Sequence, residues 1–236
     1  MTLRAAIEAR YAASTAELVA LAEFQRLERG EVGHEAYDLF LANVIRAHLK
    51  SPKILAFLYS ASAPKASADL LHNMLEELGV EEEDGTSHPE LLRRLAHGAG
   101  LGEALPGLEQ LADDDLKAIV VEPLMYGTLR DVALAVLIET IAYEWMLSRT
   151  SGRIAAFLQV HRGLDAATLA WFSHHSEVDV RHAEEGLDAI ARTVDYYAIP
   201  TEDAETILEL TMRENVFIKR YFGELTHDRL ALMARR

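Results

Sequence analysis

The fold of this chain is decided by the stretch Trp-Phe-Ser-His-His-Ser-Glu-Val-Asp-Val-Arg-His-Ala, residues 171–183. It lies in a run, residues 165–195, that contains no proline and a single glycine, which predicts one long helix. With about 3.6 residues per turn, His175, Asp179 and His182 stand at positions i, i+4 and i+7 and share one face. Two imidazoles and a carboxylate form a ligand set that suits non-haem iron. The alternative interpretation is a solvated, charged helix face without a metal.

The composition is that of a globular protein with one sizeable core. The chain has 236 residues, of which 50% are hydrophobic and 26% are charged, and we expect one domain over residues 1–236. Cysteine is absent, which excludes disulfides, thiol catalysis and cysteine-ligated zinc. The formal net charge of −15 argues against nucleic acid and anionic membranes as partners.

No segment of the sequence has the length of a membrane span. The longest uncharged apolar run, residues 132–138, is much shorter than the roughly 20 residues that a spanning helix needs. The first residues break their apolar pattern with charges and lack the core of a signal peptide. We therefore expect a cytoplasmic protein.

Apolar side chains recur at helical spacing along almost the whole chain, and no segment has a convincing strand period. The pattern therefore predicts a single all-α domain. A loop is expected over residues 99–113, and Ser87 is expected to cap the helix that follows an acidic loop. The predicted helices cover residues 3–29, 33–59 with a kink or interruption at Pro52, 64–78, 87–98, 114–122, 128–147, 151–161, 165–195 and 201–235.

Glu139 is a candidate metal ligand because it follows the most apolar run of the chain, residues 132–138. A segment that is apolar all round is expected to be buried, and a buried carboxylate needs a partner. A metal ion is one such partner. A salt bridge or a protonated carboxyl group is the alternative.

Glu76 and His88 are candidates from a second region. Glu76 and Glu77 end a predicted helix, and His88 opens the next one across a short loop. The chain can therefore bring His88 back toward Glu76. A surface role for Glu76 and a simple helix start for His88 are the alternatives.

The six candidate ligands balance the charge of two iron ions. Three carboxylates and three neutral imidazoles leave a centre with two Fe(II) ions within one unit of neutral, which makes burial tolerable. A ferritin-type site would use Glu-x-x-His on two helices. Such a pair, Glu31 and His34, straddles Gly33, so ferritin-like architecture is the weaker interpretation. The six candidates are Glu76, His88, Glu139, His175, Asp179 and His182.

These residues resemble a known family, the haem-oxygenase-like diiron oxidases, which are also called iron-containing redox enzymes. The resemblance runs from about residue 17 to residue 195. The most specific element is the His-x-x-x-Asp-x-x-His pattern with Phe172 before it and Ala183 after it. The other matching elements are Asn73-x-x-Glu76-Glu77-x-Gly79, His88-x-x-Leu91 and Glu139.

The resemblance implies a haem-oxygenase-like bundle of seven or more helices in which the six residues hold two irons that activate O2. It also implies oxidation of a small organic substrate, amino-acid-like or fatty-acid-like, with an external electron donor. Similar proteins are usually homodimers.

Several alternatives stay open at this point. The loop between Glu76 and His88 is longer than in compact members of the family, so Glu77 can take the place of Glu76. Trp171 is an oxidisable side chain, although aromatic packing is its more common use. A mononuclear iron site on the three ligands of residues 175–182, or a metal-free binding module with the same fold, are the rival functions.

Two further interpretations concern charged side chains. The acidic loop, residues 81–84, is predicted to be solvated and not to hold metal, because its like charges repel. Arg46, Lys50 and Lys53 share one helix face and would meet a substrate carboxylate, or else form a solvated surface.

Overall fold

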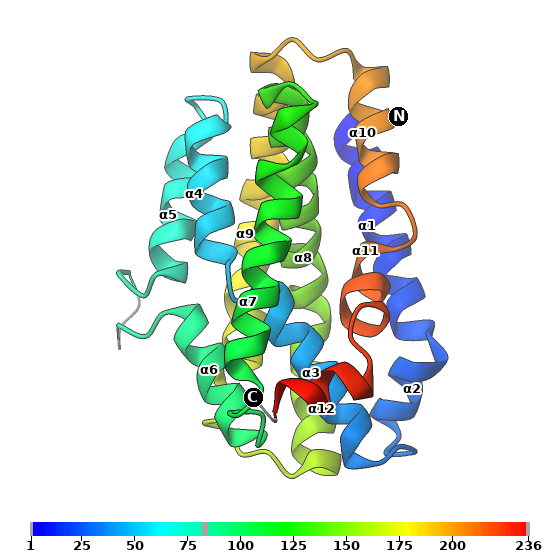
Figure 1. Ribbon diagram of the computed structural model, residues 1–236. Coiled ribbons are helices and arrows are strands. Elements are labelled where there is room, and N and C mark those ends of the chain that lie inside the picture. Colours follow the sequence, from blue (N-terminus) through cyan, green and yellow to red (C-terminus); the bar gives the residue numbers. More distant parts are fainter. Residues whose placement is uncertain (1, 82–84, 235–236) are drawn as a thin grey trace.

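Two long antiparallel helices form the centre of the molecule. The computed structural model describes residues 2–81 and 85–234, with the side chains of residues 177–180 left aside, and all regular elements in this part are helical. Helix α8 (Leu129–Phe157) and helix α9 (Ala170–Tyr196) lie side by side, and the other helices surround them (Figure 1). The prediction of an all-α bundle is confirmed.

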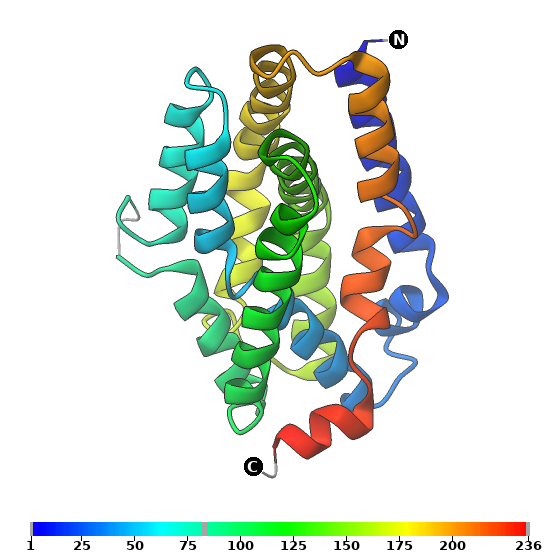
Figure 2. The same ribbon diagram turned by 45° about the horizontal axis from the view of Figure 1, so that its top comes forward.

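The remaining helices fall into two flanking groups. Helices α4 and α5 lie on one side of the central pair, and helices α1 and α10 lie on the other (Figure 2). The elements that precede α8 are α1 Leu3–Ala20, α2 Ala22–Glu28, α3 His34–His48, α4 Ser51–Ala61, α5 Ser67–Glu77, α6 His88–Gly98, α7 Leu105–Leu116, the π-helix η1 Lys117–Val121 and the 3-10 helix η2 Pro123–Met125. The elements that follow α8, apart from α9, are the π-helix η3 Leu158–Arg162, α10 Thr201–Thr211, α11 Val216–Ile218, the π-helix η4 Lys219–Gly223 and α12 His227–Met233.

The apolar run at the start of α8 is buried, as its composition predicts. All of residues 132–138 except Ala135 are at most 6% exposed. Helix α9 approaches this part of the bundle closely at Gly186, where a Cβ atom would lie 2.2 Å from Cδ1 of Ile141. The absence of a side chain at Gly186 therefore lets the two central helices pack at short distance.

A tight turn after α5 returns the chain toward α6. Gly79 has φ of +76°, and a Cβ atom there would meet the backbone of Thr86 and Ser87 at 2.7 Å. The Ser87 hydroxyl accepts a hydrogen bond from the backbone N–H of Glu90, which confirms the predicted N-cap. These two features place the end of α5 and the start of α6 next to one another.

Some predicted boundaries were wrong. The expected loop over residues 99–113 contains most of α7, because Pro106 stands in its first turn and Leu108 and Leu111 face the core. The predicted helix over residues 151–161 continues α8 without a break.

The helices predicted at the two ends of the chain are also interrupted. The one over residues 3–29 breaks at Leu21, between α1 and α2. The last predicted helix, residues 201–235, breaks at Glu214 and Asn215, which both have positive φ. The Asn215 side chain stabilises this break, since it donates to the carbonyl of Ser14 at 2.8 Å and accepts from the N–H of Ile218.

Candidate metal centre

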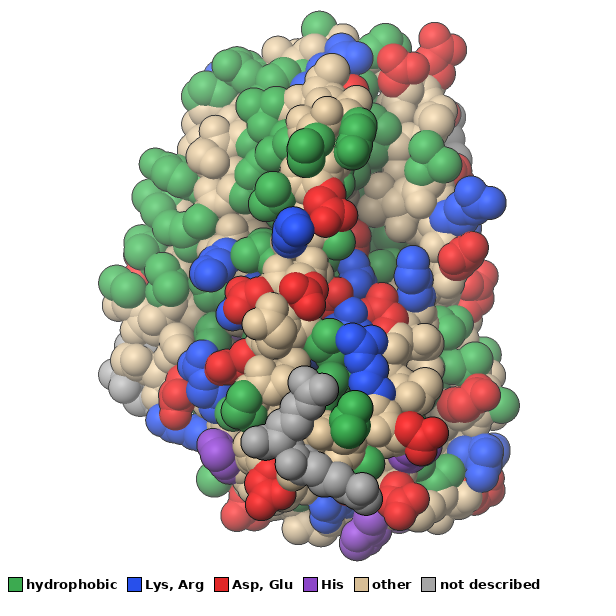
Figure 3. Space-filling model, in the orientation of Figure 1, with side chains coloured by type: hydrophobic (Ala, Val, Ile, Leu, Met, Phe, Trp, Pro, Cys, Tyr) green, Lys and Arg blue, Asp and Glu red, His purple; other side chains and the backbone are tan. Residues whose placement is uncertain are grey.

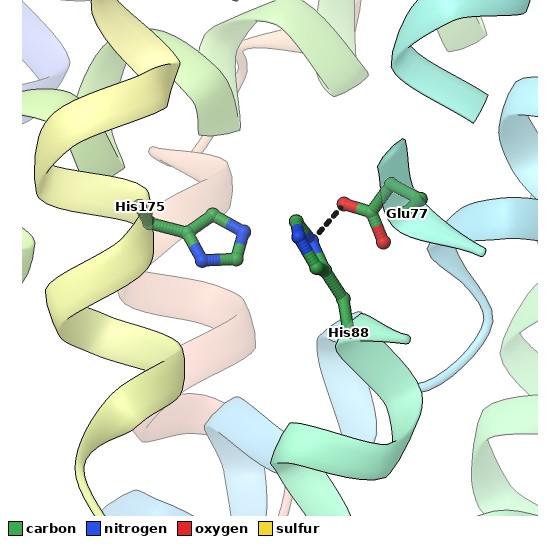
Figure 4. A group of neighbouring side chains, drawn as sticks. All are labelled: Glu77, His88 and His175. Atoms are coloured by element: carbon green, nitrogen blue, oxygen red, sulfur yellow. Dashed lines mark ion pairs between the residues drawn. The ribbon is translucent and has the colours of Figure 1, made fainter. Parts of the chain in front are cut away.

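Three buried side chains from three helices converge between α5, α6 and α9. Glu77 ends α5, His88 begins α6, and His175 lies in the first half of α9 (Figure 4). Each offers one ligand atom, and these atoms all lie within 4.8 Å of one another. The side chains are at most 6% exposed, so water does not solvate the group.

Glu77 is oriented from both sides. Its Oε1 lies 2.9 Å from Nδ1 of His88, and its Oε2 accepts a hydrogen bond of 2.6 Å from the Ser51 hydroxyl. Burial acts to raise the pKa of the carboxyl group, but His88, His175 and Ser51 together hold that pKa below its ordinary value. Glu77 is therefore an ionised carboxylate inside the protein.

His175 presents one ring nitrogen to this group. Its Nδ1 donates a hydrogen bond of 2.8 Å to the backbone carbonyl of Trp171, so Nε2 carries the lone pair. Burial lowers the pKa of His175 to about 3, and the nearby His88 acts in the same direction. The imidazole is neutral at physiological pH, which is the form that binds metal.

The donor set fits iron. One ionised carboxylate and two imidazoles in a water-excluded position form a nitrogen and oxygen set typical of non-haem iron sites. In the metal-free fold the buried Glu77 carboxylate is balanced by its ion pair with His88. A divalent cation bound by Glu77, His88 and His175 would take over this role.

A second group of titratable side chains lies beside the first. Nε2 of His182 contacts Oε2 of Glu76, and Nδ1 of His182 lies 3.6 Å from Oε2 of Glu144. Arg181 donates to the other oxygen of Glu76 at 2.6 Å, and Asn73 donates to Oε1 of Glu144 at 3.2 Å. Two of the predicted ligands, Glu76 and His182, thus meet each other in this group.

Glu144 is the residue that the sequence analysis missed. It comes from α8, is 7% exposed, and its charge acts on both His175 and His48. A signal was present in the sequence, since Leu137, Ile141 and Glu144 stand at i, i+4 and i+7 and share one buried face. The buried stripe of α8 therefore predicts Glu144 as an inward carboxylate.

Glu139, the predicted ligand on α8, lies elsewhere. Its carboxylate stands 3.5 Å from the guanidinium of Arg220, and the structure does not bring it into the Glu77–His88–His175 group. Burial raises the pKa of Glu139, while Arg220 acts to lower it. The geometry thus supports the ion-pair alternative at Glu139. The physical reason is helical phase, because residues five apart on a helix point about 140° away from each other.

The other candidates are placed as follows. The carboxylate of Asp179 lies outside the described side chains, although its backbone belongs to α9. Of the acidic loop, Glu81 contacts His72, and residues 82–84 lie outside the described part of the chain. Predictions about Asp179 and this loop therefore stay predictions.

The cationic helix face of α3 and α4 is occupied by ion pairs. Arg46 binds Asp115 with two contacts, at 2.6 and 2.7 Å, while Lys50 and Lys53 both lie near Asp113. These side chains are thus paired with protein carboxylates, and the suggestion that they meet a substrate loses support.

The indole of Trp171 lies against the centre and not in it. Its ring centroid is 4.2 Å from that of His175, and its side chain is 1% exposed. Trp171 acts on the site through its backbone carbonyl, which orients His175. It is a positioning residue.

The fold and the site together define a helical-bundle protein with a buried Glu/His/His group of metal-ligand type. A family model described as iron-containing redox enzyme matches residues 38–214, which is most of the chain. The protein belongs to this iron-containing redox enzyme family. No curated protein matches the chain. Among the described residues, no helix combines the length and the apolarity that a bilayer span requires.

Proposed function

We propose that this protein is a non-haem diiron enzyme that uses O2 to oxidise a small organic substrate. The observation that carries the proposal is that the buried group Glu77–His88–His175 and the largely buried group Glu76–Glu144–His182 meet at one cavity, which Glu77, Glu144 and His175 line. Family membership supports iron and a redox role. An external electron donor and a homodimeric assembly belong to the same proposal.

The two groups supply six side chains from helices α5, α6, α8 and α9. Glu77, His88 and His175 would hold one iron, and Glu76, Glu144 and His182 would contribute to a second. Bound iron supplies the electrons with which O2 is reduced. Asp179 remains a candidate ligand from the sequence, and its side chain lies outside the described part of the structure.

The protein around the two groups orients the ligands and excludes water. The Trp171 carbonyl holds the ring of His175, Ser51 holds Glu77, and Asn73 holds Glu144. An inner cavity of about 70 Å³ opens beside them. Its lining includes Glu77, Glu144 and His175 together with apolar Leu55, Val136 and Leu147. A small apolar substrate group held in this cavity would lie against Glu77, Glu144 and His175, three of the residues that would hold the irons.

A mononuclear site is the second candidate, and one observation favours it. Glu76 contacts His182 and accepts a hydrogen bond from Arg181, so Glu76 and His182 have protein partners without a second metal. The ligand atoms of Glu77, His88 and His175 converge as one three-residue set. In that case the single iron would lie on Glu77, His88 and His175. This set differs from the mononuclear alternative of the sequence, which used His175, Asp179 and His182.

Iron content measured after anaerobic Fe(II) reconstitution and desalting separates the candidates. Two irons per chain are expected for the diiron enzyme, one for the mononuclear enzyme, and none for a metal-free binding module. Glu144→Gln should remove about one iron, and the matched variant Glu139→Gln on the same helix should leave both. His175→Ala should lower iron content sharply, while His174→Ala should not. Equal loss in the two α8 variants would contradict the placement of Glu144.

A further inference from the structure

A row of three aromatic rings leads away from the candidate metal centre. The indole of Trp171 lies against the imidazole of His175, with ring centroids 4.2 Å apart, and against that of His48, with centroids 5.0 Å apart. Nε2 of His48 in turn lies 2.8 Å from the hydroxyl of Tyr221. Trp171, His48 and Tyr221 are at most 8% exposed. The three side chains therefore form an unbroken path of contacts inside the protein.

The far end of this path lies at a cavity other than the one beside the centre. Tyr221 belongs to the π-helix η4, a type of element that is frequent at functional sites, and it lines a cavity between α2, α3 and η4. This outer cavity has a volume of about 530 Å³, whereas a cavity of roughly 150 Å³ is known to hold benzene. Its aromatic and aliphatic walls include Leu27, Leu39, Phe40, Ile218, Tyr221 and Phe222. A small aromatic molecule fits such a space and can stack on its rings.

The rim of the outer cavity carries charges of both signs. Exposed Arg26 and Lys219 stand at it together with exposed Glu23 and Glu214. On the side of the molecule where α2, α11 and α12 lie, Lys and Arg side chains are interspersed with Asp and Glu (Figure 3). The rim therefore does not select a strongly charged ligand, and the aromatic walls favour an uncharged one.

The hydrogen bond between Tyr221 and His48 makes Tyr221 easier to oxidise. A phenol gives up its proton when it loses an electron, so a buried tyrosine is oxidised readily only where a base accepts that proton. The Tyr221 hydroxyl is the more acidic partner and donates to Nε2 of His48, which is such a base. Tyr143 also packs against His48, with ring centroids 5.0 Å apart, but its hydroxyl donates to the backbone carbonyl of Val216 at 3.4 Å. A carbonyl oxygen is not a base, so Tyr143 is the matched comparison.

We propose that Trp171, His48 and Tyr221 form an electron relay between the candidate centre and the outer cavity, and that this cavity receives a small aromatic electron donor of hydroquinone type. The oxidant is the iron centre of the proposed function after its reaction with O2, and the inference rests on that function only for this oxidant.

Electrons and protons balance along the relay. Trp171 gives one electron to the oxidised centre, and Tyr221 replaces it on the indole while the phenolic proton passes to Nε2 of His48. The donor in the outer cavity then returns one electron to Tyr221, the proton moves back from His48, and the oxidised donor releases its own proton to water. The centre is thus reduced by one electron and the donor is oxidised by one. Transfer between the three side chains needs no iron.

Flash photoionisation of tryptophan in the metal-free full chain tests the relay. A Trp145→Phe background leaves Trp171 as the sole tryptophan, and the flash uses light that indole absorbs and phenol does not. The absorption of the tryptophanyl radical should decay as that of a tyrosyl radical rises, and more slowly in D2O. Tyr221→Phe and His48→Phe should each slow this decay about tenfold or more, whereas Tyr143→Phe should change it by less than about twofold.

Hydroquinone added to the same protein tests the outer cavity. It should shorten the lifetime of the tyrosyl radical, with a rate that saturates as its concentration rises, because a bound donor is expected. Ala36→Trp, which places an indole in the lining of the outer cavity, should remove most of this effect and leave the transfer from Tyr221 to Trp171 unchanged.

Several outcomes would overturn the relay. These are equal decay of the tryptophanyl radical with and without Tyr221, loss of the tyrosyl signal in Tyr143→Phe, or quenching by hydroquinone that rises linearly without saturation. If Tyr221→Phe does not fold, His48→Phe and the measurement in D2O decide, and an unchanged rate counts against the proposal.

Electron paramagnetic resonance of the Fe(II)-loaded protein, frozen after mixing with O2, keeps the relay distinct from the proposed function. A tyrosyl radical is expected in the wild type and in Tyr143→Phe, and not in Tyr221→Phe. Its absence from wild-type protein that holds iron counts against the relay. Failure to bind iron counts against the proposed function alone, since the photochemical transfer from Tyr221 to Trp171 persists without metal.

Discussion

At the scale of single residues, burial decides which groups are charged. His48 of α3 is buried beside the centre, where its Nε2 lies 2.8 Å from the Tyr221 hydroxyl and its ring packs against Tyr143 and Trp171. Burial lowers the pKa of His48 to about 4, although the carboxylates of Glu77 and Glu144 oppose this shift. The folded protein therefore keeps His48 neutral under conditions in which an unfolded chain would protonate it.

This difference predicts that the metal-free protein loses stability on mild acidification. The pKa of His48 falls from 6.5 in the unfolded chain to about 4 in the fold, so the unfolded state takes up the proton first as pH falls. The contribution of neutral His48 to the free energy of unfolding is present in full above pH 6.5. It is lost between pH 6.5 and 4, by up to about 3 kcal/mol. Urea unfolding at several pH values measures it. The loss should be smaller in His48→Phe and unchanged in a variant of exposed His227; identical pH profiles for wild type and His48→Phe would contradict it.

At the scale of elements, the site depends on the contact between α8 and α9 and on the irregular turns around it. Helix α8 carries Glu144 and α9 carries His175 and His182, so a shift of one helix against the other would move two ligand sets apart. Two of the π-helices also reach the inner cavity, η1 with Ile119 and η4 with Arg220. Such segments are frequent at functional sites because they re-aim side chains within a helix.

The close approach of α8 and α9 is tested by two glycines in the same pair of helices. Gly186→Ala should destabilise the fold by about 1–3 kcal/mol, because the new methyl group would overlap buried Ile141. Gly152→Ala should be neutral or stabilise by up to about 1 kcal/mol, because its Cβ atom would meet only Ser176 at 3.8 Å. Chemical denaturation measures both. Equal stability of the two variants would show that α8 and α9 are not closely packed at Gly186.

At the scale of the whole molecule, the buried ligand groups couple metal binding to folding. The converging side chains come from helices that are distant in sequence, from α5 to α9, and an unfolded chain does not hold them together. A metal that binds only the folded state stabilises it by mass action. The metal thus acts on the stability of the entire bundle. Homodimer formation and a cytoplasmic location stay predictions, and size-exclusion chromatography with light scattering tests the first.

Fe(II) should accordingly raise the unfolding temperature of the anaerobic protein. Free metal at about 100 times its Kd contributes about 2.7 kcal/mol, which corresponds to a rise of roughly 5–10 °C for a chain of this size. Differential scanning calorimetry in the absence of O2 measures the shift. The rise should be lost in His175→Ala and retained in His174→Ala. A similar rise in both variants would indicate binding at exposed carboxylates and not at the centre.

The sequence by itself determined the helical class, the long helix around residues 171–183, and the helix cap at Ser87. These depend on periodicity and backbone chemistry, which are properties of neighbouring residues. It also brought out His88 and His175, which the structure places together.

Only the tertiary structure decided which carboxylates meet those histidines. Successive helical residues point about 100° apart, so Glu77 and Glu76 face different neighbours, and Glu144 faces inward where Glu139 meets Arg220. A short window of sequence contains both members of each pair but not the helices that pack against them. Packing against α6 and α9 decides that Glu77, and not Glu76, meets His88 and His175. Packing against η4 decides that Glu139 meets Arg220 and leaves Glu144 to face inward.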